Sequence, residues 1–286
     1  MDVASLPRPV GFVLGGGGSL GAVQVGMLQA LAEHGVAPDL VAGTSIGSIN
    51  GAVLAFDPKG AGNRLSHTWP KMKREHILPG GPVDQARTLQ RSKTHLFPNS
   101  ALATVIADFI GEETTFDDLE LPFSAVTMDV ATARPHVIRE GQLLPALLAS
   151  AAIPGVWPPV EHEGRLLYDG GVVANVPLRQ AHDMGARSLV VLDCAFAGRL
   201  PETPDTLAEV LLYTGLVTMR AQAVLEAPLV AETVPVVYIP GPEPLPISTL
   251  DFDHTSELIE RSYEVARSFL ERVDITGPGL YGSPSA

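Results

Sequence analysis

Short apolar runs and helical periodicity alternate along the first part of this chain. Residues 10–14 form an apolar run that ends in four glycines, as a buried strand does. In residues 20–34 apolar side chains recur every three or four positions, which is typical of a helix, and Gly35 caps it. A second apolar run at 40–42 leads into a helical stretch at 46–56. This alternation predicts an α/β fold with a mainly parallel central sheet and helices on its faces.

The same alternation continues toward the C-terminus. We expect further strands at 123–130, 136–139, 165–168, 188–193 and 234–239. Helices are expected at 142–150, 177–184, 206–226 and 256–273. The proline-rich segment 153–159 is not expected to form a regular element.

Residues 57–100 lack strong periodicity and lie between two parts of this core. Short helices separated by Pro and Gly clusters are expected at 63–77, 84–93 and 100–110. Cationic side chains concentrate here, at Lys71, Lys73, Arg74, Arg87, Arg91 and Lys93. Solvated helix faces are the simpler interpretation, and a mobile lid with affinity for phosphate head groups is the alternative.

The chain is expected to form a single domain over residues 1–286. Its 45% hydrophobic content is enough for a sizeable core, which we assign to 10–195 with C-terminal helices up to 273. Segment 57–100 is then a helical insertion or lid over this core, because a structureless connection of that length is uncommon. The tail at 274–286 is rich in Gly, Pro and Ser and is expected to be disordered.

Charge and cysteine content narrow the partners and the location. The formal net charge of −13 argues against nucleic acid and against electrostatic docking on anionic lipid, and it favours neutral or zwitterionic substrates. Cys194 is the only cysteine, which excludes an intrachain disulfide and fits a reducing compartment. The first nine residues lack the pattern of a secretory signal, and no apolar stretch reaches about 18 residues. We therefore expect a cytoplasmic protein with peripheral rather than spanning membrane contact.

A serine stands where the second apolar run meets the following helix. Ser45 lies in the string Gly43-Thr44-Ser45-Ile46-Gly47, which has the form of a nucleophile elbow. Glycines on both sides are needed because larger side chains would collide with the strained strand-to-helix turn. The helix N-terminus behind the serine offers N–H groups and a partial positive charge to an oxyanion. Ser45 is therefore a candidate nucleophile, with a small-residue turn as the alternative interpretation.

Four consecutive glycines between the first strand and the first helix are the second candidate feature. The N–H groups of loop 15–21 can point at an anion, and Gly16, Gly18 and Gly21 match GxGxxG. A dinucleotide site would want an acidic residue at the end of the second strand, whereas Asp39 precedes that strand. No Gly-Lys-Ser/Thr follows to make a nucleotide P-loop. The loop fits better as an oxyanion hole that faces the candidate nucleophile.

The base that would activate the serine has two candidates. Among the eight histidines His254 is the best triad partner, yet its surroundings are those of an ordinary helix entry. Asp169 follows an expected strand, and Gly170 and Gly171 allow a tight bend that brings its carboxylate close to another backbone. A carboxylate is a weak base toward serine, so Asp169 needs a desolvated site and direct contact with the hydroxyl. An aspartate before two glycines more commonly forms a simple turn, and this is the alternative interpretation.

Three glycine-rich strings in the chain resemble the patatin-like phospholipase family. They are, in order, Gly16-Gly17-Gly18 with Gly21, Gly43 to Gly47, and Asp169-Gly170-Gly171. The resemblance covers residues 10–193 and also takes in the segment 150–159, SAAIPGVWPP. It implies a three-layer α/β/α fold and a Ser-Asp dyad in place of a triad.

The resemblance also implies a role for each candidate residue. Ser45 attacks an ester carbonyl, Asp169 takes its proton, and the N–H groups of Gly16, Gly17 and Gly18 hold the oxyanion. Water that the same aspartate activates releases the acyl group. The implied substrate is a phospholipid, lysophospholipid or acylglycerol, and no metal ion or organic cofactor is implied.

The chain departs from the family pattern at Leu20, where Arg or Lys is common. This weakens the expectation of phospholipid specificity more than that of ester hydrolysis. Three alternatives stay open: a soluble short-chain carboxylesterase on the same dyad, a triad esterase that uses His254, and a non-enzymatic regulatory or interaction member of the family.

Overall fold

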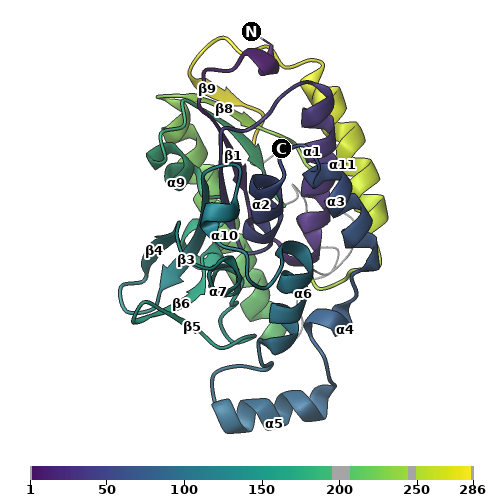
Figure 1. Cartoon of the computed structure of the whole chain (residues 1–286), viewed down its shortest axis with the longest axis vertical. Helices are drawn as coiled ribbons and strands as arrows, with labels where there is room; N and C mark the ends of the chain where they lie inside the picture. The colour runs from purple at the N-terminus through teal and green to yellow at the C-terminus, as the bar shows by residue number, and fades with distance from the viewer. Residues whose placement is uncertain (1, 195–206, 244–248, 285–286) are drawn as a thin grey trace.

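Nine strands form one sheet in the part of the chain that this computed structural model describes, residues 2–194, 207–243 and 249–284 (Figure 1). The strands are β1 Val10–Leu14, β2 Leu40–Thr44, β3 Phe123–Asp129, β4 Arg134–Ile138, β5 Val160–His162, β6 Arg165–Asp169, β7 Ser188–Leu192, β8 Pro235–Tyr238 and β9 Gly279–Tyr281. Their order is β5-β6-β3-β2-β1-β7-β8-β9, and β4 also pairs with β3. Along this order, β3, β2, β1, β7, β8 and β9 each pair in parallel with the next strand. Strands β4 and β6 pair antiparallel with β3, and β5 pairs antiparallel with β6.

Helices cover both faces of the sheet (Figure 1). They are α1 Ala22–Glu33, α2 Ile46–Phe56, α3 Ala61–Thr68, α4 Arg74–Ile77, α5 Pro82–Ser92, α6 Ser100–Ile110, α7 Leu143–Ser150, α8 Gly171–Ala174, α9 Leu178–Asp183, α10 Leu207–Ala231 and α11 Thr255–Leu270. The expected α/β/α fold with a mainly parallel sheet is therefore confirmed.

The central strands are apolar along their whole length because they are buried on both faces. Neighbouring side chains of β1 point to opposite sides of the sheet. Phe12 joins the core cluster that contains Val23 of α1, whereas Val13 joins the cluster that contains Leu178 of α9. The sheet is thus the middle layer between two packed cores.

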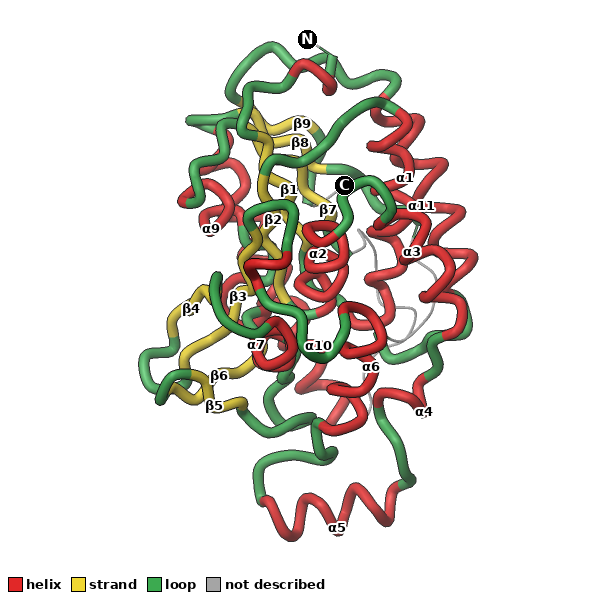
Figure 2. The backbone as a smooth tube through the Cα atoms, viewed as in Figure 1, coloured by secondary structure: helices red, strands yellow, loops and turns green. Residues whose placement is uncertain are grey.

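The segment 57–100 is built of helices and loops between α2 and α6 (Figure 2). The single helix expected at 63–77 is instead three pieces: α3, a 3-10 turn Trp69–Lys71 and α4. The reason is Pro70, which lacks the N–H that a continuing helix needs and sits in the 3-10 turn. Helix α5 follows after a further glycine-rich loop.

The C-terminal tail differs from its expected disorder. Within 274–284, residues Gly279–Tyr281 form β9 and pair in parallel with β8, while 285–286 lie outside the described residues. The Tyr281 hydroxyl accepts the N–H groups of Thr276 and Gly277. Composition alone missed this strand because its ladder partners come from β8, more than forty positions earlier in the chain.

Candidate active site

Ser45 lies at the sharp turn between β2 and α2. Its φ of 54° and ψ of −128° are strained for a residue with a side chain. A Cβ on Gly43 would lie 2.4 Å from the Gly47 carbonyl oxygen, and one on Gly47 would lie 2.3 Å from that of Leu14. The turn can therefore form only with glycine at both positions, as the sequence predicts.

The end of α7 holds the backbone of this turn. The Ser45 N–H donates to Oγ of Ser150 at 3.0 Å, and the Ser150 hydroxyl donates to the Val126 carbonyl of β3 at 2.7 Å. Two residues later, the carbonyl of Ala152 accepts the N–H of Asp169 at 2.9 Å. One short segment thus fixes both the turn and the aspartate. Reasoning from the residues alone missed Ser150; the only signal was that it opens the segment 150–159 that resembles the family.

Asp169 ends β6 and is buried, with 3% of its surface exposed. Burial raises the pKa of its carboxyl to about 6, opposed by the hydrogen bond from the Ser45 hydroxyl and by the Gly171 N–H, which donates to Oδ1 at 2.7 Å. A Cβ on Gly170 would lie 2.4 Å from the Val126 carbonyl oxygen, so this bend also needs glycine. The fold therefore brings Ser45 and Asp169 together, although 124 residues separate them in the chain.

The glycine loop lies against the same turn. A Cβ on Gly16 would be 3.0 Å from Cβ of Ser45 and 2.7 Å from Oδ1 of Asn175. The Gly16 N–H donates to the Asn175 carbonyl at 3.1 Å, so it does not point freely into the site as the sequence suggested. Within the described ranges, the N–H groups of Gly17 and Gly18 have no hydrogen-bond acceptor. These two groups are the ones left to receive an oxyanion.

Two residues behind the loop set its shape. Asn175, just after α8, accepts from the Gly16 N–H with its carbonyl, and its Nδ2 lies 3.4 Å from the Gly16 carbonyl. Cys194 is buried, its Sγ lies 3.4 Å from the Gly15 carbonyl, and burial raises the pKa of its thiol. The cysteine is therefore a packing residue, as expected. Asn175 carried no signal in the sequence.

Leu20 packs into the core instead of offering a charge to the site. It is 8% exposed and belongs to the core cluster that contains Val23 of α1. Gly21 beside it approaches α2 closely, because a Cβ there would meet Ile46 at 2.5 Å. An Arg or Lys at position 20 would have to leave this apolar contact.

His254 lies at the start of α11 with acidic neighbours. Its ring nitrogens lie 3.8 Å from Asp251 and 3.6 Å from Glu257, and 44% of its side chain is exposed. In the described part of the chain it makes no hydrogen bond to Ser45. Asp39, the acid weighed for a dinucleotide site, accepts the Val10 N–H and pairs with Arg8, so it has a structural partner.

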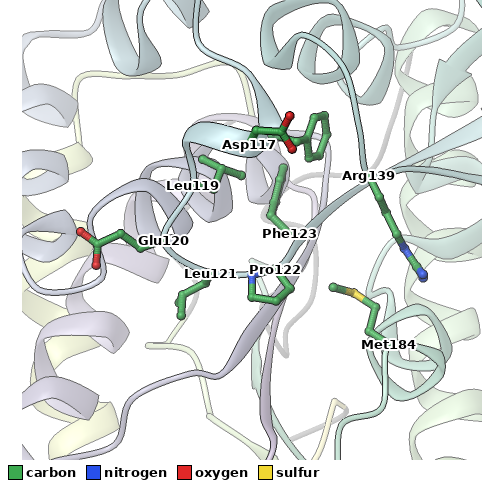
Figure 3. A pocket seen from close by; sticks show the side chains of 9 residues that line it. Asp117, Leu119, Glu120, Leu121, Pro122, Phe123, Arg139 and Met184 are labelled. Carbon is green, nitrogen blue, oxygen red and sulfur yellow. The ribbon is translucent and has the colours of Figure 1, made fainter.

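One pocket in the described residues lies away from the elbow. A pocket of about 500 Å³ is lined by Leu121, Pro122 and Phe123 where β3 begins, and by Arg139 and Met184 (Figure 3). Because β3 runs parallel to β2, this pocket lies at the end of the sheet opposite Ser45. Across the described ranges no group of three His, Cys, Asp or Glu side chains is arranged to hold a metal ion. In the same ranges no helix combines the length and apolar character that crossing a bilayer requires.

Comparison with known proteins gives one family. The family model described as "Patatin-like phospholipase" matches residues 12–182. Patatin-like phospholipase domain-containing protein 7 of Mus musculus is 33% identical over 190 residues, which cover 64% of this chain and 13% of that protein. Lysophospholipase nte1 of Aspergillus terreus is 26% identical over 303 residues, covering 94% of this chain and 18% of that protein. This chain therefore spans less than a fifth of the length of either relative.

Proposed function

The match over residues 12–182 makes this chain a member of the patatin-like phospholipase family, and on that premise we propose that it is a serine acyl hydrolase of lipid esters. Ser45 is the proposed nucleophile and Asp169 the proposed base. The observation that carries the proposal is the buried Asp169 carboxyl beside the Ser45 hydroxyl, with a pKa raised by burial to about 6. Such a carboxylate is a stronger base than an exposed one, and it is still ionised at neutral pH.

The proposed reaction has two halves. Ser45 Oγ attacks the ester carbonyl while its proton passes to Asp169, and the tetrahedral oxyanion accepts the N–H groups of Gly17 and Gly18. The proton then goes to the leaving alcohol, which departs and leaves the acyl group on Ser45. Water, deprotonated by Asp169, attacks this ester and regenerates the serine. Gly16 positions the loop through its bond to the Asn175 carbonyl.

The proposed substrates are phospholipids, lysophospholipids or acylglycerols. Support comes from the family description and from the name of the Aspergillus terreus relative, a lysophospholipase. Leu20 is buried, so no cation from that position helps to bind a phosphate head group. A soluble short-chain carboxylesterase on the same two residues is the second candidate, favoured by this missing cation.

The dyad is tested by labelling and by substitution. We expect a fluorophosphonate probe to modify the folded wild type and to leave Ser45→Ala unlabelled. Asp169→Asn should abolish ester turnover, whereas His254→Ala should be mild because His254 makes no hydrogen bond to Ser45 in the described part of the chain. Full turnover in Asp169→Asn, or loss of turnover in His254→Ala, would replace the dyad with a triad.

The substrate class is tested with a panel of esters graded by acyl length. Wild type should prefer long chains, with a rate that rises above the micelle threshold, and Ser45→Ala should be inactive throughout. A preference for short chains would favour the soluble carboxylesterase. Biological activity that survives fully in Ser45→Ala would instead indicate a non-enzymatic role.

A further inference from the structure

Helix α5 turns its apolar side chains toward solvent. Val83 is 63% exposed and Leu89 is 44% exposed, and none of the eleven residues of the helix is buried. The half-buried positions are polar instead: Gln85, Thr88 and Ser92, which share one face at helical spacing. An amphipathic helix of a globular protein normally buries its apolar face. Helix α5 does the opposite, so its apolar face is available to something outside the described chain.

Figure 1 shows α5 standing apart from the rest of the molecule, joined to it by two extended connections. Both connections are anchored on elements that carry the candidate active site. On one side buried Trp69 donates its Nε1–H to Oδ1 of Asn50, on α2, at 3.1 Å. On the other side the N–H of Phe97 donates to the Val156 carbonyl at 2.9 Å, shortly after the end of α7. The segment that carries this helix is thus tied at both ends to the body, on one side to α2 and on the other to the loop after α7.

The charge of this segment is opposite to that of the chain. Residues 71–93 carry six Lys and Arg against two acidic side chains, a net charge of +4 in a chain of −13. All six cations are exposed. On the helix itself, the exposed residues Val83, Ala86 and Leu89 follow one another at a spacing of three and form an apolar stripe. Arg87 and Arg91 lie at the edge of this stripe that Val83 forms, because they follow it at i+4 and i+8. Asp84, on the same helix, is 3.8 Å from Arg87 in an exposed pair that contributes little.

The position of α5 limits how strongly the negative charge of the body affects it. Charges separated by more than a Debye length, about 8 Å at physiological ionic strength, are largely screened from each other in water. Arg87 and Arg91 stand on a helix that Figure 1 shows apart from the body, so a surface that touches α5 meets these two cations while the body's negative charge is partly screened. The overall charge of −13 disfavours docking of the body, but it does not disfavour docking of α5.

We propose that α5 docks on an anionic lipid surface, with Val83 and Leu89 entering the boundary of head groups and acyl chains and with Arg87 and Arg91 binding lipid phosphates. An exposed apolar stripe flanked by cations is the pattern of a helix that lies in a membrane interface. The proposal rests on the proposed function in one respect, because the bilayer would be the source of the ester substrate. A second copy of this chain fits the helix less well, since contact between two α5 helices would bring like charges together.

Vesicle flotation of the full chain tests the proposal without any catalytic step. The Ser45→Ala variant serves as parent, so that the lipid is not consumed. It should float with vesicles of phosphatidylcholine mixed with phosphatidylglycerol, and much less with phosphatidylcholine alone. Val83→Glu/Leu89→Glu and Arg87→Glu/Arg91→Glu should each lower the partition by about tenfold or more, and added salt should weaken the binding of the parent.

The matched control carries two acidic substitutions at another exposed apolar pair. Val130 and Leu166 are 42% and 50% exposed, and they lie just after β3 and on β6, outside the segment that carries α5. Val130→Glu/Leu166→Glu should float like the parent, and every variant with Ser45 restored should hydrolyse p-nitrophenyl butyrate at the wild-type rate. Equal flotation of the α5 variants and the control would overturn the proposal. So would sedimentation velocity that shows a dimer broken by the α5 substitutions, since the occupant would then be a second copy.

Failure of the proposed function gives a different result. If wild type hydrolyses no ester and takes no fluorophosphonate label, the acyl hydrolase assignment falls, whatever the vesicles show. If hydrolysis is present but flotation is independent of α5, only the docking proposal falls.

Discussion

Ser150 accepts the backbone N–H of Ser45 through its Oγ at 3.0 Å, and both residues are buried. The Ser150 hydroxyl proton is committed to the Val126 carbonyl, so its oxygen is left as an acceptor facing the turn. This matters because Ser45 has a positive φ, at which a residue other than glycine is stable only when its surroundings hold it. Ser150 is therefore a positioning residue for the proposed nucleophile.

Replacement of Ser150 should loosen the elbow. In Ser150→Ala the Ser45 N–H loses its acceptor in a buried place, which costs about 1–3 kcal/mol of folding free energy. We expect kcat for a soluble ester to fall more than KM changes, because Oγ of Ser45 is no longer fixed for attack. Urea unfolding and steady-state kinetics measure the two effects.

Ser124 on β3 provides the matched control. It is also fully buried, but its hydroxyl has no hydrogen-bond partner in the described structure. Ser124→Ala should therefore leave both stability and kcat near wild type. Equal losses in the two variants would mean that the bond to Ser45 has no special role.

The rate should depend on the protonation of Asp169. Burial raises the pKa of this carboxyl to about 6, and only its ionised form can take the proton of Ser45. We expect kcat/KM for an uncharged p-nitrophenyl ester to rise with pH, to reach half its limit near pH 6 and to level off above it. A profile that is flat between about pH 5 and pH 8 would show that no such base controls the free enzyme.

The same pKa predicts how stability changes with pH. The folded-state pKa of about 6 lies above the unfolded value of 3.8, so the folded chain binds more protons between these pH values. The free energy of unfolding therefore falls as pH rises through this window, by about 3 kcal/mol in total for a shift of about two units. This stabilisation is fully present below the lower value and is lost above the upper one.

Asp169→Asn removes the titrating group and isolates its contribution. We expect urea unfolding near pH 4 and near pH 7 to show that the free energy of unfolding of the variant rises relative to that of wild type. The difference should change by up to about 3 kcal/mol between the two pH values. The comparison between pH values cancels any fixed cost of the amide. A difference that does not change with pH would mean that Asp169 titrates normally.

The glycine loop should tolerate no side chain at Gly17. A Cβ there would lie 2.3 Å from Cβ of Cys194, so Gly17→Ala must displace the loop. We expect kcat to fall on the order of a hundredfold, as for the loss of an oxyanion donor. In Gly17→Ala/Cys194→Gly the nearest remaining atom would be Cα of residue 194, at 3.6 Å, so part of the rate should return.

Gly81→Ala is the control for this pair. Its φ of −105° suits alanine, and a Cβ there meets nothing within 4 Å. The activity of the Gly81→Ala variant on soluble esters should equal that of wild type. Absence of any rescue in the double variant would indicate that Gly17 acts through a contact other than Cys194.

The local sequence predicted the parts of the site that depend on neighbours in the chain. The turn at Ser45 requires glycine at 43 and 47, and those residues are visible as a string. The bend after Asp169 is visible in the same way, through Gly170 and Gly171. The order of strands and helices also follows from local apolar spacing, which is why the α/β fold could be predicted and then confirmed.

Contacts between distant segments could not be predicted in this way. The hydrogen bond from Ser45 to Ser150 joins positions 105 residues apart, and the bond that takes up the Gly16 N–H comes from Asn175. The strand β9 forms because its backbone pairs with that of β8. In each case the partner is chosen by the packing of the sheet, which no local pattern records.

By itself, then, the sequence determined the turns and the apolar faces, because those depend on the size and polarity of adjacent residues. Its resemblance to the family is what indicated Asp169 as the partner of Ser45. Only the tertiary structure decided which backbone donors are free, what holds Ser45 in its strained conformation, and that the apolar side of α5 faces outward. The physical reason is that burial and hydrogen-bond partnership are properties of residues brought together by the fold. The net charge of −13 does not record where the charges lie, whereas the sequence itself shows six Lys and Arg within residues 71–93.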